Sequence, residues 1–187
     1  MMRLFVAIPL PEELRDRLAQ MSGALDNARW VDPENMHLTL RFLGELDGRE
    51  AADLDSALAT IRVPAFQMEL VGLGTFETGR KINALWVGVE APEELARLQV
   101  KVENAAQRAG QPPEGRKFRP HVTLARFKGA PGPKLGDFLS EFSLFRSGLI
   151  LVDRFVLYSS KLTEKGPIYR EEAVYPLDVF GLRAQSK

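Results

Sequence analysis

Residues 37–40 read His-Leu-Thr-Leu, and residues 121–124 read His-Val-Thr-Leu. These two phrases contain both histidines of the 187-residue chain. Histidine is the one side chain whose unperturbed pKa lets it give and take protons near neutral pH. A protein that has only two histidines, each followed by the same pattern, is expected to use them for chemistry. The repeated phrase therefore predicts a paired acid–base site.

The duplication extends beyond the histidines. Residues 4–14 read Leu-Phe-Val-Ala-Ile-Pro-Leu-Pro-Glu-Glu-Leu, and residues 85–95 read Leu-Trp-Val-Gly-Val-Glu-Ala-Pro-Glu-Glu-Leu. These stretches are offset by 81 residues (4 to 85) and the histidines by 84 (37 to 121), so the two frames agree within a small loop insertion. A repeat of this length exceeds a solenoid unit. We predict one bilobal domain over residues 1–187, built from half-domains that begin near residues 3 and 84.

Each half-domain is expected to begin with a strand that leads into a helix. Apolar runs at 3–8 and 84–89 have strand length, and the Pro-Glu-Glu that follows suits the first turn of a helix. Leucines and other apolar residues then recur at helical spacing, which predicts two helices packed on the core, the second ending at Gly110. The two stripes are Leu14, Leu18, Met21 and Leu25, and Leu95, Leu98, Val102 and Ala106.

The remaining pattern predicts an α+β fold. We expect the histidine phrases on strands at 36–43 and 120–127, and a third helix at 48–60. Further strands are predicted at 66–73, 149–158 and 168–175. Residues 128–137 are dense in glycine and proline and are predicted to form a loop, and residues 182–187 a short loose tail. Together these elements indicate antiparallel sheets with helices on their outer faces.

Composition narrows the possible classes of function. Lys+Arg and Asp+Glu both number 25, so the total charge gives no bulk attraction to nucleic acid or an acidic membrane. The chain has no cysteine, which excludes disulfides, thiolate catalysis and cysteine–zinc sites. Its apolar runs are too short for a signal-peptide core or a membrane span. We expect a cytoplasmic protein without a membrane partner, and a monomer, since nothing indicates an obligate oligomer.

The histidine phrases suit chemistry at phosphorus. Residues i and i+2 share one face of a strand, so His37 and Thr39 point one way, and His121 and Thr123 repeat the arrangement. Across a cleft, one imidazole can take a proton from an attacking oxygen while the other gives a proton to the departing one. The threonine hydroxyls can donate hydrogen bonds to the non-bridging oxygens. This mechanism requires no metal or other cofactor, and two histidines alone are too few ligands for a zinc site.

At this point the motifs resemble those of a known family. Residues 33–45, Pro-Glu-Asn-Met-His-Leu-Thr-Leu-Arg-Phe-Leu-Gly-Glu, resemble the first motif of the RNA 2′,3′-cyclic phosphodiesterases. These proteins are also called 2′-5′ RNA ligases and belong to the two-histidine phosphoesterases. Residues 118–126, Phe-Arg-Pro-His-Val-Thr-Leu-Ala-Arg, resemble the second motif. The stretches at 3–8, 157–160 and 166–169 are also similar to family landmarks, so the resemblance covers nearly the whole chain.

The resemblance implies a fold, a substrate and roles. The fold would be bilobal, with two antiparallel sheets lining a central cleft. The substrate would be RNA ends bearing a 2′,3′-cyclic phosphate, hydrolysed to a 2′-phosphomonoester, with a reversible ATP-independent 2′-5′ joining of such ends to a 5′-hydroxyl. His37 would donate a proton to the leaving 3′-oxygen, and His121 would accept one from water. From the residues alone the order of these roles stays open, because the two halves are alike.

Two arginines follow the histidine phrases and could bind the substrate phosphate. Arg41 lies four residues after His37, which places it on the histidine face of a regular strand. Arg126 lies five after His121, on the opposite face unless a bulge intervenes. Each could equally be a solvated or ion-paired arginine.

Other residues are candidates for RNA contacts. Residues 116–119, Arg-Lys-Phe-Arg, and Arg80-Lys81 are local basic clusters, so Lys117 and Arg119 could contact the RNA backbone. Several aromatic residues could stack on a terminal base, of which Phe118 and Tyr158 are selected. Tyr169, with the Gly-Pro before it, could form a cleft loop. The aromatic residues not selected are Trp30, Phe42 and Phe127.

Two other functions are consistent with the same residues. One is a phosphodiesterase that acts on small nucleotide cyclic phosphates. The other is a non-catalytic RNA-binding protein that uses the same cleft. Intact histidine and threonine in both phrases favour catalysis, because binding alone does not need a paired proton relay.

Overall fold

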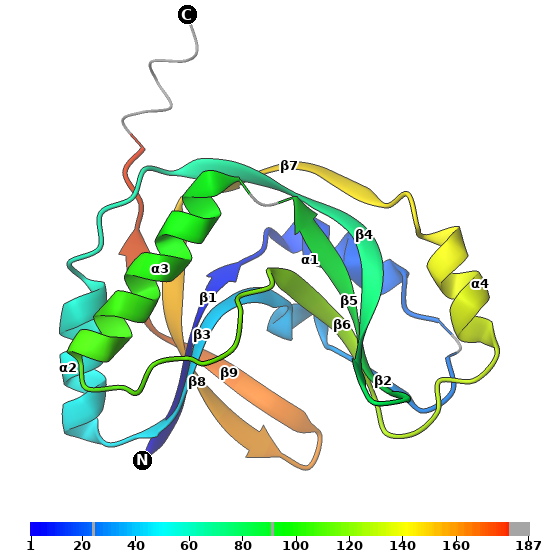
Figure 1. Ribbon diagram of the computed structural model, residues 1–187, viewed down its shortest axis with the longest axis horizontal. Helices are drawn as coiled ribbons and strands as arrows, with labels where there is room; N and C mark the ends of the chain where they lie inside the picture. Colours follow the sequence, from blue (N-terminus) through cyan, green and yellow to red (C-terminus); the bar gives the residue numbers. More distant parts are fainter. Residues whose placement is uncertain (24, 91, 180–187) are drawn as a thin grey trace, which may run out of the picture.

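The computed structural model describes residues 1–23, 25–90 and 92–179. Within these residues the chain forms nine strands, four α-helices and one 3-10 helix (Figure 1). In chain order they are β1 (Met2–Pro9), α1 (Glu12–Gln20), β2 (Ala28–Trp30), η1 (Pro33–Asn35), β3 (His37–Leu46), α2 (Gly48–Leu58), β4 (Phe66–Thr78), β5 (Lys81–Glu90), α3 (Glu93–Arg108), β6 (His121–Phe127), α4 (Lys134–Glu141), β7 (Arg146–Val152), β8 (Arg154–Thr163) and β9 (Gly166–Pro176).

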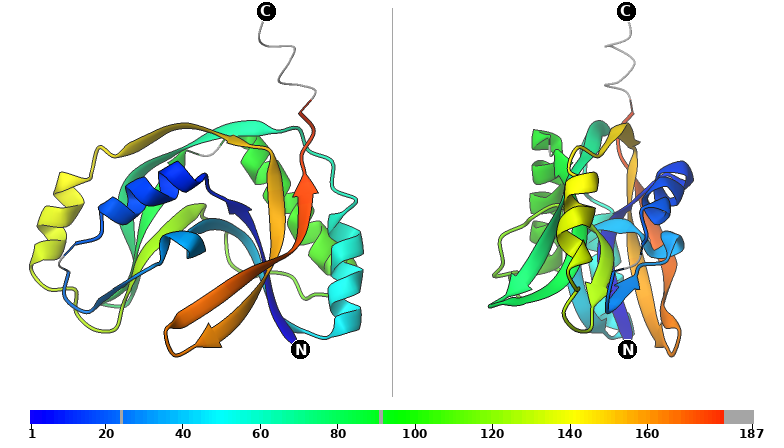
Figure 2. Two further views of the ribbon diagram at one scale, coloured as in Figure 1. Left: turned by 180° about the vertical axis from the view of Figure 1, so that it is seen from behind. Right: turned by 90° about the vertical axis from the view of Figure 1, so that its right-hand side faces the viewer.

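The strands form two antiparallel sheets, and each sheet contains strands from both half-domains. One sheet has the order β3-β1-β8-β9 and the other β2-β6-β5-β4-β7. In each, the strand that opens the half-domain (β1 or β5) pairs with the strand that carries the histidine (β3 or β6). The sheets curl toward each other, and the molecule has the outline of an arch (Figures 1 and 2). The predicted α+β fold with two antiparallel sheets and duplicated halves is confirmed.

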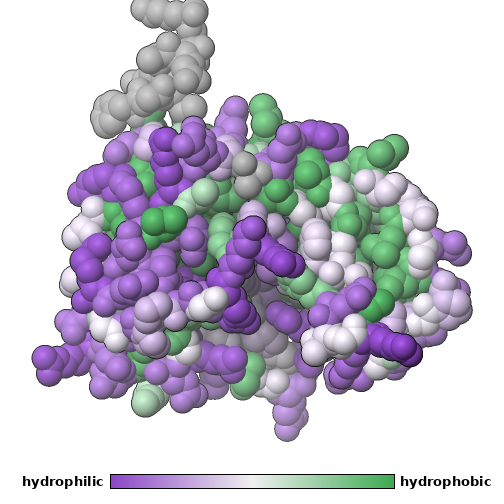
Figure 3. Space-filling view, viewed as in Figure 1, coloured by the Kyte–Doolittle hydropathy of each residue, from purple (hydrophilic) through white to green (hydrophobic). Residues whose placement is uncertain are grey.

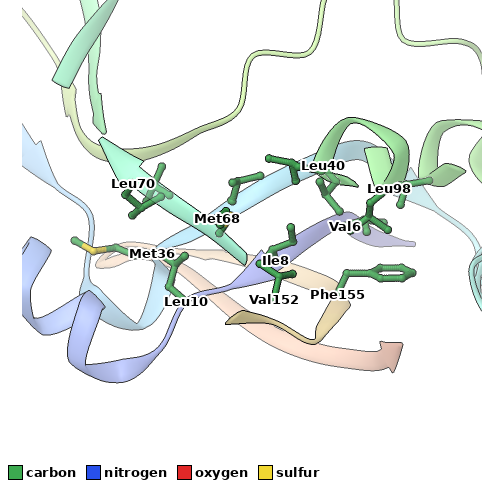
Figure 4. Close-up of a cluster of buried hydrophobic side chains, with 14 of the residues drawn as sticks. Val6, Ile8, Leu10, Met36, Leu40, Met68, Leu70, Leu98, Val152 and Phe155 are labelled. Carbon is green, nitrogen blue, oxygen red and sulfur yellow. The ribbon is translucent and has the colours of Figure 1, made fainter. Parts of the chain in front are cut away.

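The two lobes share one core because helices cross between them. α3 follows β5 of the second sheet but packs on β3 of the first, beside α2. α1 follows β1 of the first sheet, and its Arg17 donates hydrogen bonds to the carbonyls of Arg146 and Ser147 on β7 of the second. Buried side chains from β1, β3, β4, β7 and α3 meet in one continuous cluster, part of which is shown in Figure 4. Burial of this shared apolar surface fixes the lobes relative to each other.

Four details of the predicted elements were wrong. The run 149–158 is two strands, β7 and β8, which separate at Asp153 and enter different sheets. The predicted loop 128–137 contains the start of α4, which buries Leu135 and Phe138. The glycines and prolines in this stretch led to the prediction of a loop in place of a helix. The first helix ends at Gln20, and the short strand β2 was not predicted. The predicted tail at 182–187 lies outside the described residues.

No helix among the described residues is both long enough and apolar enough to cross a bilayer.

Candidate active site

The two histidine phrases lie on strands that meet between the lobes. β3 and β6 contact each other at the centre of the molecule, although they belong to different sheets. The leucines and valine that alternate with the histidines and threonines are fully buried, while His37, Thr39, His121 and Thr123 are half-buried. The predicted alternation is therefore confirmed on both strands. Figure 3 shows the surface hollowed between the lobes.

The backbone two residues before each histidine acts on its imidazole ring. Nδ1 of His121 lies 2.7 Å from the carbonyl oxygen of Arg119. The backbone of Asn35, two residues before His37, raises the pKa of that ring, as the backbone of Arg119 does for His121. A carbonyl oxygen can only accept, so Nδ1 of His121 carries the proton and Nε2 is left free for proton transfer. Asn35 is itself held by a 2.9 Å hydrogen bond from its Nδ2 to the carbonyl of Pro167.

The surroundings favour the neutral form of both rings. The pKa of His37 is lowered to about 4, chiefly by burial, with smaller contributions from the positive charge of Arg126 and from His121. Burial also lowers the pKa of His121, and Arg126 again adds to the effect. The backbone hydrogen bonds act in the opposite direction but do not outweigh burial. Arg126 thus acts electrostatically on both imidazoles, which places its charge in the same site.

Aromatic rings account for this burial. The rings of Phe5 and Tyr169 lie 4.9 Å and 5.3 Å from the ring of His37, centroid to centroid. On the other lobe, the ring of Phe76 meets His121 edge-on at 4.7 Å, and Trp86 lies 6.4 Å away. These rings replace water around the imidazoles and restrict their rotation.

Matching β-bulges change the face of the residues that follow the histidine phrases. On β3, Thr39 pairs with Ala7 but Arg41 already pairs with Val6, so Leu40 is the extra residue. On β6 the register shifts in the same place, and Leu124 is the extra residue. A bulge inserts one residue and reverses the alternation beyond it. The residue five positions after each histidine therefore lies on the histidine face, and these residues are Phe42 and Arg126.

The prediction that Arg41 shares the histidine face is wrong. The bulge turns its side chain to the opposite face, where it is only 8% exposed. Its Nε lies 2.7 Å from Glu103 Oε2 on α3, an ion pair whose angles do not meet those of a hydrogen bond. Its two Nη atoms donate to Glu114 Oε2 at 3.3 Å and to the carbonyl of Pro112 at 2.5 Å. These contacts tie β3 to α3 and to the loop that precedes β6.

The sequence left open whether Arg126 lies on the histidine face of its strand. The bulge in β6 places it there. Its guanidinium lies within electrostatic reach of His37, His121 and Tyr169. Two half-buried neutral imidazoles beside one arginine form a site that attracts an anion.

The predicted RNA-contact residues have different surroundings. Phe118 packs against the hydrophobic core, which leaves it poorly placed to stack on a base. Lys117 and Arg119 are exposed, and Arg119 orients His121 through its carbonyl. Tyr158 is half-buried and stacks on Phe5 with a centroid distance of 5.2 Å. Burial raises the pKa of Tyr158 to about 12, so its phenol is neutral.

The sequence analysis considered Phe42 for stacking without selecting it, and it did not name Arg29, Phe76 or Trp86 as residues of the site. Phe42 is 54% exposed beside Phe5, and Arg29 lies opposite Arg126 on β2. Phe76 and Trp86 border His121. The sequence signal that could have selected Phe42 is its spacing, because Phe42 and Arg126 each lie five residues after a histidine.

Comparison with known proteins identifies the class. An antiparallel arch with a His-x-Thr strand from each lobe is the architecture of a two-histidine phosphoesterase. The family model described as "LigT like Phosphoesterase" matches residues 8–86 and again residues 87–169, one match for each half. The chain belongs to this family, the LigT-like phosphoesterases.

Individual relatives agree with this assignment. The chain is 40% identical over 159 residues to an RNA 2′,3′-cyclic phosphodiesterase of Aeropyrum pernix, which covers 84% of this chain and 89% of the relative. It is 33% identical over 182 residues to a protein of the same name from Methanothermobacter thermautotrophicus, covering 94% and 98%. Its fold is similar to that of Escherichia coli LigT complexed with 3′-AMP, with a TM-score of 0.77, 28% identity and coverage of 94% and 98%.

Proposed function

We propose that this protein hydrolyses the 2′,3′-cyclic phosphate at the 3′ end of RNA to a 2′-phosphomonoester. The observation that carries the proposal is the pair of oriented imidazoles, one from each lobe, with Arg126 acting on both. The names of the relatives support the substrate, and a LigT complex with 3′-AMP supports nucleotide binding by this fold.

In the proposed reaction, the cyclic phosphate lies between His37 and His121. Nε2 of His121 accepts a proton from water as the water oxygen attacks phosphorus, in line with the bond to O3′. That bond breaks, and His37 donates a proton to O3′, which leaves the phosphate on O2′. Thr39, Thr123 and Arg126 stabilise the charge that develops on the non-bridging oxygens. Because the imidazoles move the protons and the arginine stabilises the charge, the reaction needs no metal.

Substrate binding favours protonation of His37 by solvent, which gives the ring the proton that it donates. In the free protein the pKa of His37 is about 4, so the ring is neutral at pH 7. An anionic phosphate placed beside the ring favours the imidazolium form and raises this pKa. The acid is thus formed chiefly in the complex, where it is used.

Phe42 is placed to hold the terminal base. It is a large apolar side chain that is 54% exposed on the histidine face, next to Phe5. Every nucleobase presents a flat surface to an aromatic ring, so stacking binds the base without selecting its identity.

The 2′-5′ joining of RNA ends uses the same groups. A 5′-hydroxyl takes the place of water, His121 accepts its proton, and the product is a 2′-5′ phosphodiester. We propose this reaction as a secondary activity. The cytoplasmic location and the monomeric state stay predictions.

One experiment separates this function from its two rivals. Purified protein with EDTA is incubated with an oligoribonucleotide ending in a 2′,3′-cyclic phosphate, with a cyclic mononucleotide, and with a 3′-phosphate oligomer as the control. We expect the cyclic oligomer to yield a 2′-phosphate. Turnover of the mononucleotide alone would instead indicate a small-nucleotide phosphodiesterase, and binding without turnover an RNA-binding protein.

A further inference from the structure

Arg29 and Arg126 lie directly opposite each other on neighbouring strands. They are cross-strand partners in the antiparallel pair β2–β6, so their side chains leave the sheet on the same side. Ala28 and Trp30, on either side of Arg29, pack against the core, which confirms that Arg29 faces away from it. Both arginines therefore face the cleft.

This arrangement is unfavourable without a ligand. Like charges directly opposite on a sheet repel each other. Among the residues that the structure describes, neither Arg29 nor Arg126 forms an ion pair with a carboxylate. A pair of arginines on a cleft face with no acidic partner indicates an anion that is supplied from outside.

The position of Arg29 distinguishes its anion from the reacting phosphate. Arg126 acts on both imidazoles, whereas Arg29 belongs to β2, the edge strand of its sheet. The guanidinium of Arg29 reaches the other lobe: a Cβ added at Gly166, which opens β9, would lie 3.0 Å from Arg29 Nη2. Gly166 has a φ of +122°, a conformation that favours glycine. Arg29 thus lies at the margin of the site, one strand outward from Arg126.

We infer that Arg29 binds the internucleotide phosphate on the 5′ side of the terminal nucleotide. This inference rests on the proposed function, in which Arg126 binds the reacting cyclic phosphate. The next phosphate along an RNA chain is the nearest second anion that such a substrate carries. Arg29 therefore favours an oligonucleotide over a cyclic mononucleotide, which lacks that phosphate.

The test compares two substrates in two variants. The substrates are a ribotrinucleotide ending in a 2′,3′-cyclic phosphate and a nucleoside 2′,3′-cyclic phosphate. We expect Arg29→Gln to raise KM for the trinucleotide about tenfold or more, as for loss of one charge-assisted hydrogen bond, and to leave KM and kcat for the mononucleotide unchanged. Arg97→Gln is the control, because it removes one exposed arginine on α3 that pairs with Glu93. This variant should leave KM and kcat unchanged for both substrates.

Two further measurements assign the phosphate. A trinucleotide with a neutral methylphosphonate at the last internucleotide linkage should bind wild type and Arg29→Gln equally. The slope of log KM against log salt for the normal trinucleotide should fall by about 0.7 in Arg29→Gln, the value for one contact to a single strand. The thermal midpoint of Arg29→Gln should not fall, since a repulsion is removed.

The possible outcomes are distinct. If Arg29→Gln affects the trinucleotide and the mononucleotide equally, Arg29 binds the reacting phosphate and the inference is overturned. If the substitution affects neither substrate, the inference is also overturned. If the wild-type protein hydrolyses neither substrate, the proposed function itself is overturned.

Discussion

Phe42 and Arg126 occupy the same position in the two halves of the molecule, five residues after His37 and His121. In each half a bulge at the leucine of His-x-Thr-Leu turns this residue onto the histidine face. One lobe thereby contributes an exposed ring and the other a cation. The duplicated scaffold is symmetric, but the two sides of the site differ in chemistry, which suits a substrate with a base at one end and a phosphate at the other.

Removal of either imidazole should nearly abolish hydrolysis. We expect His37→Ala and His121→Ala each to lower kcat by roughly 10²–10⁴-fold, the contribution of one positioned acid or base. Thr39→Val and Thr123→Val should cost less, about 3- to 10-fold, because each removes one neutral hydrogen bond. Single-turnover assays on a cyclic-phosphate oligomer measure these effects. A near-wild-type rate in either histidine variant would exclude the two-histidine mechanism.

Substitution of Arg126 should lower activity, whereas substitution of Arg41 should lower stability. Arg126→Gln should lower kcat/KM by about 10²–10³-fold with little change in stability, since its side chain is exposed in the cleft. Arg41→Met should lower the free energy of unfolding by about 3 kcal/mol, because it leaves Glu103 and Glu114 without their buried cation. Urea unfolding and steady-state kinetics on both variants distinguish the roles. A stable, inactive Arg41→Met variant would contradict this assignment.

Phe42 should contribute to substrate binding through its ring alone. Base–aromatic stacking is worth about 1–3 kcal/mol, so Phe42→Ala should lower kcat/KM by roughly 5- to 150-fold. Phe42→Trp keeps a flat ring and is the matched control, with activity close to wild type. A substrate that ends in an abasic cyclic phosphate should be insensitive to both changes. Sensitivity of the abasic substrate would mean that the ring acts on the histidines and not on the base.

The pH dependence should place the optimum of kcat/KM on the acidic side of neutral. The active form needs His37 protonated and His121 neutral, and the pKa values of both are lowered in the free protein. Its population therefore falls at higher pH as His37 loses its proton and at lower pH as His121 gains one. The two limbs report apparent pKa values of the pair. Because bound phosphate raises the pKa of His37, the alkaline limb of kcat should lie at higher pH than that of kcat/KM, and coincident limbs would contradict this.

Burial of His37 should also make stability depend on pH. Its pKa is about 4 in the folded protein and 6.5 ordinarily, so between these values the unfolded chain binds more protons. The stability is fully present above pH 6.5 and is lost as pH falls toward 4, by about 3 kcal/mol from this group. His37→Gln should lose correspondingly less over the same range, as measured by urea unfolding at several pH values. An identical loss in both proteins would show that His37 is not buried as a neutral ring.

Local patterns were sufficient for much of this structure. The period of two along 37–40 and 121–124 placed His37, Thr39, His121 and Thr123 on one face of each strand, and the repeated stretches indicated two related halves. Such patterns work because burial of every second side chain on a strand is a local property. The prediction of a single strand at 149–158 was wrong because the residues on both sides of Asp153 are apolar. The chain changes sheet at Asp153, and only pairing with distant strands decides this.

The sequence by itself determined the fold class, the duplication and the four polar residues of the two phrases. The tertiary structure decided which residues surround them. Whether Arg41 or Arg126 enters the site depends on bulges, and a bulge is set by the register with β1 or β5, strands more than thirty residues away in the chain. The lowered pKa values likewise come from rings that only the assembled lobes bring beside the imidazoles. Cross-strand register and desolvation are properties of contacts between distant segments, so no local pattern encodes them.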